Sequence, residues 1–415
     1  MPPQTTDSVN NSSESPLVYR FLTKDSIQAL KDFQYNGADH SLLYKYILSP
    51  LAGFLVDHAT PSTVAPNTIT LFGFAFMMVA YAMIQHHCPT FDHCTPKNEV
   101  PGYIFLVNGI ALLVYQTLDN MDGKHARKTG SSSPLGLFFD HGLDACNTFI
   151  GTVNIICMFG IASTDLGSII VIATMSSLPF FVSTWEEYHT HKLELPLING
   201  PSEGLFGNAV MSFATWYFGQ QFWHEHSMYN AIMPYLPLSI LGMLPEEVSH
   251  VHLFCAILSI MTMREVLSKM FNVVKQYGIQ TIVMLSPMAA LVVLSILIVQ
   301  RNPEVFIRNQ RLSLFIFGLT FVEMVTALML DHMTKREFVP YRHTLSPLFI
   351  LYTLVDLEVP MKYLTIYVAV YGSGLSSYVM VKTKAVIQEM CSALGIWCFD
   401  IITPHPNSSG EKKKK

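Results

Sequence analysis

The feature that most constrains the fold is a succession of apolar stretches, each close to the length that crosses a bilayer. They cover approximately residues 68–87, 103–119, 139–163, 167–185, 204–223, 247–267, 280–299, 312–331, 342–357 and 361–382. A helix needs about 20 predominantly apolar residues to span the hydrocarbon core. Half of the 415 residues are hydrophobic and only 13% are charged, a composition that excludes an ordinary soluble enzyme. We therefore predict an all-α, polytopic membrane protein with about ten transmembrane helices.

An acidic motif lies at the junction of the second and third apolar stretches. It consists of Asp119, Asp122, Asp140 and Asp144, with small and basic residues between them. On a helix, carboxylates three or four residues apart project from one face, so the two pairs can converge on one point. Acidic residues this close to hydrocarbon are costly and are usually functional. Oxygen ligands without a cysteine cluster favour Mg²⁺ or Mn²⁺, and two such ions form the usual clamp for displacement at phosphorus.

The spacing of this motif, D-x2-D-G-x2-A-R-x8-G-x3-D-x3-D, resembles the signature of the CDP-alcohol phosphotransferase family without a gap or substitution. Neighbouring segments resemble the eukaryotic choline/ethanolamine phosphotransferases, namely Pro66–Thr70, Tyr115–Gln116, Ser131–Gly136, Asp140–Gly142, Thr184–Glu186 and Asn199–Gly204. One departure is Leu137, where these relatives commonly carry glutamate. The resemblance implies that phosphocholine, phosphoethanolamine or both pass from the CDP-alcohol to the hydroxyl of diacylglycerol, with release of CMP.

The resemblance also implies roles for single residues. The four aspartates would hold two divalent ions, Mg²⁺ or Mn²⁺, that grip the diphosphate of the donor. Gly123 and Ala126 would let the nucleoside approach the helix backbone, while Arg127 would pair with phosphate through its planar fork. Asn67 and Gly136 match further CDP-alcohol-binding positions. The structural alternatives are a helix kink at Gly123 and a membrane-surface anchor at Arg127.

The reaction needs a base that removes the proton from the diacylglycerol hydroxyl. By resemblance to the family, Asp144 is the residue that is usually assigned as this base, but a carboxylate that binds dications is a weak base. Histidine has an ordinary pKa of about 6.5, so His141 needs no special tuning near neutrality. Glu203 lies on a later loop, where partial desolvation would strengthen it as a base. We rank His141 first and Glu203 second, and the alternative role for His141 is to orient Asp140 or Asp144.

A cationic aminoalcohol headgroup needs aromatic or acidic surroundings, because a cation over an aromatic ring gains about 0.5–2 kcal/mol. The residues that we nominate for this role are Tyr115, Trp185, Glu186 and Tyr188. Their alternative role is the aromatic belt at the membrane interface.

Composition and spacing predict five regions. They are a polar cytosolic segment (1–41), an interfacial amphipathic helix with a linker (42–66), the catalytic helix bundle (67–223), the remaining transmembrane helices for bundle completion, dimer or lipid contact (224–382), and a cytosolic tail with a lysine run (383–415). The N-terminal part lacks the basic flank and apolar core of a signal peptide, so we expect no cleaved segment. The stretch from Leu42 to Val56 is interrupted by Lys45 and Pro50, and it is too short to span comfortably.

Basic residues predict the orientation. Lys124, Arg127 and Lys128 place the acidic motif on the cytosolic side, although the arginines between residues 301 and 311 then fall on the other side. The terminal lysines resemble a dilysine retrieval signal, which indicates the endoplasmic reticulum membrane, with the Golgi as the alternative. We expect CDP-choline or CDP-ethanolamine, diacylglycerol and membrane lipid as partners, a homodimer, and no nucleic acid.

Two pairs of residues outside the motif leave alternatives open. Cys88 and Cys94 share a predicted lumenal loop, where they form either a disulfide or two free thiols. Glu323 and Asp331 are intramembrane acids that either mark a lipid path or form buried pairs, and we favour the pairs.

Two other functions compete with the one that the resemblance implies. Within the same chemistry, the acceptor could be inositol or glycerol phosphate, but those relatives resemble a shorter, six-helix chain. An ion-coupled transporter would place its acids at the bilayer midplane. The aspartates of this chain instead lie at one end of their apolar stretches, beside Arg127.

Overall fold

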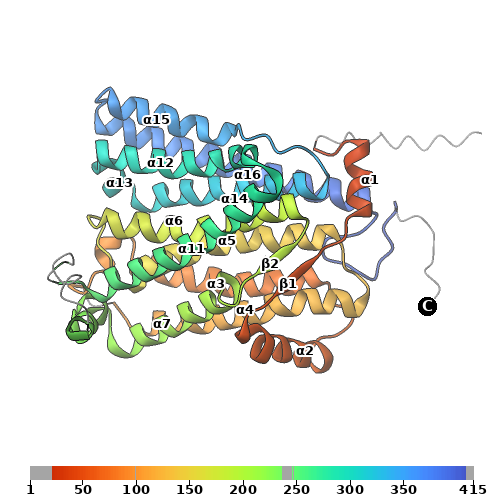
Figure 1. Cartoon of the computed structure of the whole chain (residues 1–415), viewed down its shortest axis with the longest axis horizontal. Helices are drawn as coiled ribbons and strands as arrows, with labels where there is room; N and C mark the ends of the chain where they lie inside the picture. The colour runs from red at the N-terminus through yellow and green to blue at the C-terminus, as the bar shows by residue number, and fades with distance from the viewer. Residues whose placement is uncertain (1–20, 99, 236–244, 246, 408–415) are drawn as a thin grey trace, which may run out of the picture.

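The computed structural model describes residues 21–98, 100–235, 245 and 247–407. Long helices run side by side along one direction, and α1 (Lys24–Asp32) crosses this direction at one end of the bundle (Figure 1). The long helices of the first half are α3 (Pro66–His87), α4 (Tyr103–Thr129), α5 (Pro134–Met158), α6 (Leu166–Thr190) and α7 (Leu205–Phe218). Those of the second half are α11 (His250–Tyr277), α12 (Ser286–Arg301), α14 (Gln310–Met333), α15 (Ser346–Asp356) and α16 (Met361–Leu394).

Short elements connect these helices. They are β1 (Gly37–Asp39), the π-helix η1 (Tyr44–Leu48), α2 (Ser49–His58), η2 (Phe91–Cys94), β2 (Leu193–Leu195), the π-helix η3 (Gly200–Gly204), α8 (Gln221–His224), α9 (Ser227–Ile232), η4 (Met233–Tyr235), η5 (Ile279–Leu285), α13 (Glu304–Arg308) and η6 (His343–Leu345). Strands β1 and β2 form one parallel pair, in which Gly37 lies opposite Leu193. This pair ties the N-terminal segment to the loop after α6.

Seven helices of the described chain are long and apolar enough to cross a membrane, namely α3, α4, α6, α11, α12 with η5, α14 and α16. The other three predicted stretches form α5, α7 and α15. The polar residues of the acidic motif make α5 less apolar, while α7 and α15 have only 14 and 11 residues. The all-α, polytopic membrane class is therefore confirmed.

Helix α14 is the central element that joins the two halves. It packs against α5 and α6 on one side and against α16 on another, and every residue from Thr320 to Met333 is buried. Gly318 allows a close approach to α5, because a Cβ at this position would lie 2.3 Å from the Phe149 ring. The acids of α14, Glu323 and Asp331, form the buried pairs that we favoured.

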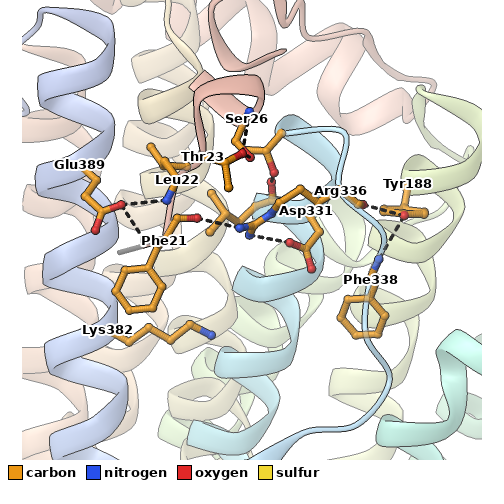
Figure 2. A network of polar contacts seen from close by, with 12 residues as sticks. Phe21, Leu22, Thr23, Ser26, Tyr188, Asp331, Arg336, Phe338, Lys382 and Glu389 are labelled. Atoms are coloured by element: carbon orange, nitrogen blue, oxygen red, sulfur yellow. Dashed lines mark hydrogen bonds and ion pairs between the residues drawn. The ribbon is translucent and has the colours of Figure 1, made fainter. Parts of the chain in front are cut away.

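The residues around the start of α1 are held by a polar network (Figure 2). The backbone amides of Phe21 and Leu22 each donate to Glu389 of α16 over 2.9 Å. Arg336 donates to the Phe21 carbonyl over 2.7 Å and to Asp331 over 2.6 Å. These contacts anchor the N-terminal segment to the second half of the molecule.

One alternative that the sequence left open is decided in the loop after α3. Cys88 and Cys94 form a disulfide, with their Cα atoms 5.2 Å apart. At the other end of the chain, helix α16 continues to Leu394. The predicted segment before residue 21 and the terminal lysines lie outside the described residues.

Candidate functional site

The acidic motif lies where α4 ends and α5 begins. Helix α4 stops at Gly130, whose φ of 67° is a left-handed conformation that glycine adopts without strain. Helix α5 starts with Pro134, and the Ser133 hydroxyl caps it by accepting from the Gly136 amide over 3.2 Å. Because of this tight connection, the last turns of α4 lie opposite the first turns of α5.

The four aspartates lie within electrostatic range of one another. The Thr70 hydroxyl donates to Asp122, and the buried Tyr115 hydroxyl donates to Asp144. One carboxylate oxygen of Asp119 and one of Asp140 are buried without a hydrogen-bond partner. Ligand atoms of Asp140, His141 and Asp144 all lie within 4.8 Å of one another. The structure therefore brings the two pairs together as the spacing predicted.

These residues fit a divalent metal centre. Buried carboxylate oxygens that have no donor are costly unless a cation satisfies them. The donor set is dominated by carboxylate oxygens, which suits Mg²⁺ or Mn²⁺ better than a soft metal. No lysine or arginine of the described chain forms an ion pair with any of the four aspartates. A cation from outside the chain would therefore complete the site.

The residues nominated for CDP-alcohol binding surround the acidic motif. The exposed Arg127 folds back over Gly123, where a Cβ would lie 3.5 Å from its guanidinium. Ala126 is on the same turn, and none of the described acids forms an ion pair with Arg127. The side-chain amide of Asn67 donates to the Cys398 carbonyl over 2.9 Å, and Gly136 lies beside its Oδ1. The segment after α16 thus contacts the predicted nucleotide side.

The two nominated bases lie on different elements. His141 is on α5, with its Nδ1 3.5 Å from Asp140 Oδ2 and without a hydrogen-bond donor or acceptor partner at that atom. Glu203 is on η3, where one oxygen accepts from the Ser41 hydroxyl over 2.5 Å and the other from the Asn199 amide over 3.1 Å. His141 therefore belongs to the candidate metal-binding cluster, whereas Glu203 belongs to a separate polar cluster.

Three of the four nominated headgroup residues are engaged elsewhere. Trp185 is fully buried and donates to the Thr281 carbonyl over 3.1 Å. Glu186 forms an ion pair with Lys269 at 2.6 Å. The Tyr188 hydroxyl donates to the Arg336 carbonyl over 2.9 Å and accepts from the Phe338 amide over 3.2 Å, as Figure 2 shows. Only Tyr115 contacts an aspartate of the motif.

A residue that we did not nominate, Glu187, faces the site. It is 3% exposed, and its nearest ion-pairing group in the described chain is His332, at 3.9 Å. Glu187 lies seven residues after Phe180, so both occupy one face of α6, and Phe180 packs edge-on against His141 with ring centroids 6.4 Å apart. The sequence alone does not show which face of α6 meets α5, so no sequence signal distinguishes Glu187 from its neighbour Glu186.

The N-terminal segment places Tyr35 close to the same acid. Phe33 contacts His332, with ring centroids 5.5 Å apart, and the Asn36 carbonyl accepts from the Leu193 amide over 2.9 Å. Desolvation, followed by the negative charges of Glu187 and Asp140, raises the pKa of the Tyr35 hydroxyl well above its usual range. Tyr35 thus lies within electrostatic range of both Glu187 and Asp140, although 49% of the residue is exposed.

Comparison with known proteins identifies similar chains. A family model described as CDP-alcohol phosphatidyltransferase matches residues 63–198. The chain is 30% identical over 410 residues to an uncharacterized CDP-alcohol phosphatidyltransferase class-I family protein 3 of Dictyostelium discoideum, and the match covers 92% of this chain and 99% of that protein.

Two further relatives have more specific names. The chain is 36% identical over 205 residues to choline/ethanolaminephosphotransferase 2 of Arabidopsis thaliana, a match that covers 49% of this chain and 50% of the plant protein. It is 24% identical over 402 residues to ethanolaminephosphotransferase 1 of Homo sapiens, which covers 95% of this chain and 98% of the human protein.

Proposed function

The chain belongs to the CDP-alcohol phosphatidyltransferase family, and on that premise we propose that it transfers phosphocholine, phosphoethanolamine or both from the CDP-alcohol to the hydroxyl of diacylglycerol. The products are phosphatidylcholine or phosphatidylethanolamine and CMP. The names of the plant and human relatives support this choice. They do not favour inositol or glycerol phosphate as the acceptor, or a transport function.

The observation that carries this proposal is the convergence of four aspartates from α4 and α5 with two buried oxygens left unsatisfied. Asp119, Asp122, Asp140 and Asp144 would hold one or two Mg²⁺ or Mn²⁺ ions against the donor diphosphate. Bound there, the ions would neutralise charge on the transferred phosphoryl group and on departing CMP.

The chain's own residues position the donor. Arg127, exposed beside Gly123, would contact a phosphate oxygen through its planar guanidinium. The absence of side chains at Gly123 and Gly136 leaves room for the nucleoside next to the two helices. Asn67 would exchange its bond to the Cys398 carbonyl for one to the nucleotide. The segment after α16 must then shift locally.

We assign proton removal from the acceptor to His141. Its Nδ1 has no hydrogen-bond partner and lies beside Asp140, so Asp140 can orient the ring and stabilise its protonated form. Glu203 is the alternative base. Its two oxygens already accept hydrogen bonds from Ser41 and Asn199, so Glu203 is engaged in the contacts that hold η3 to the N-terminal segment.

We assign recognition of the cationic headgroup to Glu187 and Tyr35. A carboxylate and an aromatic ring on one side of the metal cluster provide the surroundings that an ammonium group needs. Glu187 is buried, so its charge acts in a medium that screens less than water. Tyr115 would remain a structural partner of Asp144.

We expect this reaction on the cytosolic side of the endoplasmic reticulum membrane, in a homodimer. The basic residues around the motif and the terminal lysines support that location. The charged donor would then arrive from water, while the lipid acceptor stays in the bilayer.

One assay tests the function directly. Purified protein in lipid nanodiscs receives CDP-choline or CDP-ethanolamine, dioleoylglycerol, and Mg²⁺ or Mn²⁺, and the lipid product is identified by mass spectrometry. We expect CMP and phospholipid in equal amounts and none after chelation of the metal. The proposal would be contradicted if neither CDP-alcohol gave a phospholipid product.

A further inference from the structure

An apolar groove opens beside the acidic motif, between η1 and η3. Its volume is about 540 Å³, and it is lined by Leu42, Leu43, Tyr46, Ile47, Leu197, Ile198, Glu203 and Phe206. This volume is within the range of about 300–1,000 Å³ that is usual for small-molecule sites. Seven of the eight lining residues are apolar or aromatic, and Glu203 is the only charged one. We call this feature the η1–η3 groove.

A polar cluster joins the two walls at the Glu203 end. The Ser41 hydroxyl, just before η1, donates to Glu203 over 2.5 Å. Asp39 accepts from the Asn199 side chain over 2.9 Å and from the Ser202 hydroxyl over 2.7 Å. Ser41 is fully buried and Asn199 is 4% exposed, so these contacts fix the walls. The groove is therefore amphiphilic, with one polar end and an apolar body.

The polar end is tied to the helix that carries the catalytic aspartates. The side-chain amide of Gln116 donates to the Pro201 and Ser202 carbonyls of η3 over 2.8 and 2.7 Å. Gln116 precedes Asp119 by three residues on α4, which is about one helical turn. Glu203 is the next residue of η3 after Ser202. The polar end thus lies against the helix that carries Asp119 and Asp122.

We propose that the η1–η3 groove holds the acyl chains of the diacylglycerol acceptor, with its glycerol end at Glu203 and its free hydroxyl directed toward α4. The groove faces the side on which Leu42, η1 and α2 expose apolar residues (Leu42, Tyr46, Ile47, Leu51 and Phe54), so a lipid can enter it sideways. Diacylglycerol matches the shape, because it has one small polar end and no charge to desolvate. This inference rests on the proposed function for the identity of the lipid.

Filling the groove tests the proposal. Ile198 lines the groove and is 54% exposed, while Val210 on α7 is 48% exposed and does not line it. We expect Ile198→Trp to raise the KM for dioleoylglycerol at least about fivefold, without changing the KM for CDP-choline. The matched control Val210→Trp should leave both constants unchanged. Equal effects of the two variants, or a change confined to the CDP-choline constant, would overturn the proposal.

A binding measurement separates this inference from the proposed function. A diacylglycerol that carries a photoreactive diazirine in one acyl chain is added to wild-type protein without donor. We expect label on residues 42–47 or 197–206, and less label in Ile198→Trp. Equal labelling of the same peptides by a phosphatidylcholine probe would identify ordinary bilayer contact and reject an acceptor site. If the groove is labelled specifically but no phospholipid forms in the nanodisc assay, the function fails and the lipid site stands.

Discussion

Both halves of the molecule bury acidic side chains among apolar helices, but within the described residues the lysines and arginines that pair with them belong to the second half. Glu323 is 1% exposed and forms ion pairs with Arg342 and with Lys382, the latter at 2.7 Å. Asp331 pairs with Arg336 at 2.6 Å (Figure 2). In the first half, Asp119 and Asp140 each keep a buried oxygen without a partner.

This difference distinguishes structural acids from functional ones. A buried acid that is paired with basic side chains needs nothing from solution, and removing one partner leaves an uncompensated charge. A group of acids without such partners must either bind cations from outside the chain or take up protons. The same residue type thus stabilises the fold around α14 and creates a binding site around α4 and α5.

The largest expected effect is the loss of turnover when the unpaired acids lose their charge. Asp119→Asn and Asp122→Asn should each lower kcat by at least about 10³-fold, because the metal clamp then lacks an anionic ligand. CMP release from purified protein measures this effect. Elution of the variants as folded protein in detergent is the control. Full activity of either variant at matched concentration would contradict the distinction between structural, ion-paired acids and functional, unpaired acids.

Much of this site was predictable because its information is local. The four aspartates lie within 26 residues on two adjoining helices, so helical spacing alone indicates that each pair shares a face. The ten apolar stretches were likewise readable by length. All ten are helical, although hydropathy and length distinguish seven of them from α5, α7 and α15.

The remaining parts of the site depend on contacts between distant residues. Tyr35 reaches the site because β1 pairs with β2, which lies more than 150 residues later. Asn67 meets Cys398 across 331 residues. The sequence analysis nominated Glu186 and did not consider Glu187, and neighbouring residues on a helix point about 100° apart. Only the packing of α6 determines which one faces His141.

The second prediction concerns the catalytic base in the first half of the molecule, which contains the aspartates without lysine or arginine partners. His141→Ala should lower kcat by about 10²–10⁴-fold, with CDP-alcohol affinity and Mg²⁺ dependence nearly unchanged, because only proton transfer is lost. Glu203→Gln is the comparison variant, and we expect it mainly to raise the KM for diacylglycerol. Steady-state kinetics at varied Mg²⁺ distinguish the two. If His141→Ala instead weakens metal binding, its role is to orient an aspartate, and Glu203 becomes the base.

The third prediction concerns the second half of the molecule, where the buried acids form ion pairs. Glu323→Gln should destabilise the protein by about 3–5 kcal/mol, because the partly buried Arg342 and Lys382 then lose their partner. The Tm in detergent should fall, while kcat per folded molecule should stay within about twofold of wild type. Replacing all three residues with leucine or methionine should recover much of the Tm. A large loss of kcat at unchanged Tm would show that Glu323 serves the reaction.

The smallest effect is expected on α6, where a closely ion-paired acid and a weakly paired acid are neighbours in the sequence. Glu186 is paired with Lys269 at 2.6 Å, whereas the one ion-pair partner of Glu187 in the part of the chain that the structure describes is His332, at 3.9 Å. Glu187→Gln should therefore raise the KM for CDP-choline about tenfold, equivalent to about 1.4 kcal/mol, since one cation–carboxylate contact is lost. The matched variant Glu186→Gln should lower Tm and leave that KM unchanged, because its carboxylate serves a structural pair. The test compares KM for both CDP-alcohols in both variants. Loss of CDP-choline affinity only in Glu186→Gln would reverse the assignment and return the headgroup site to the residue that we first nominated.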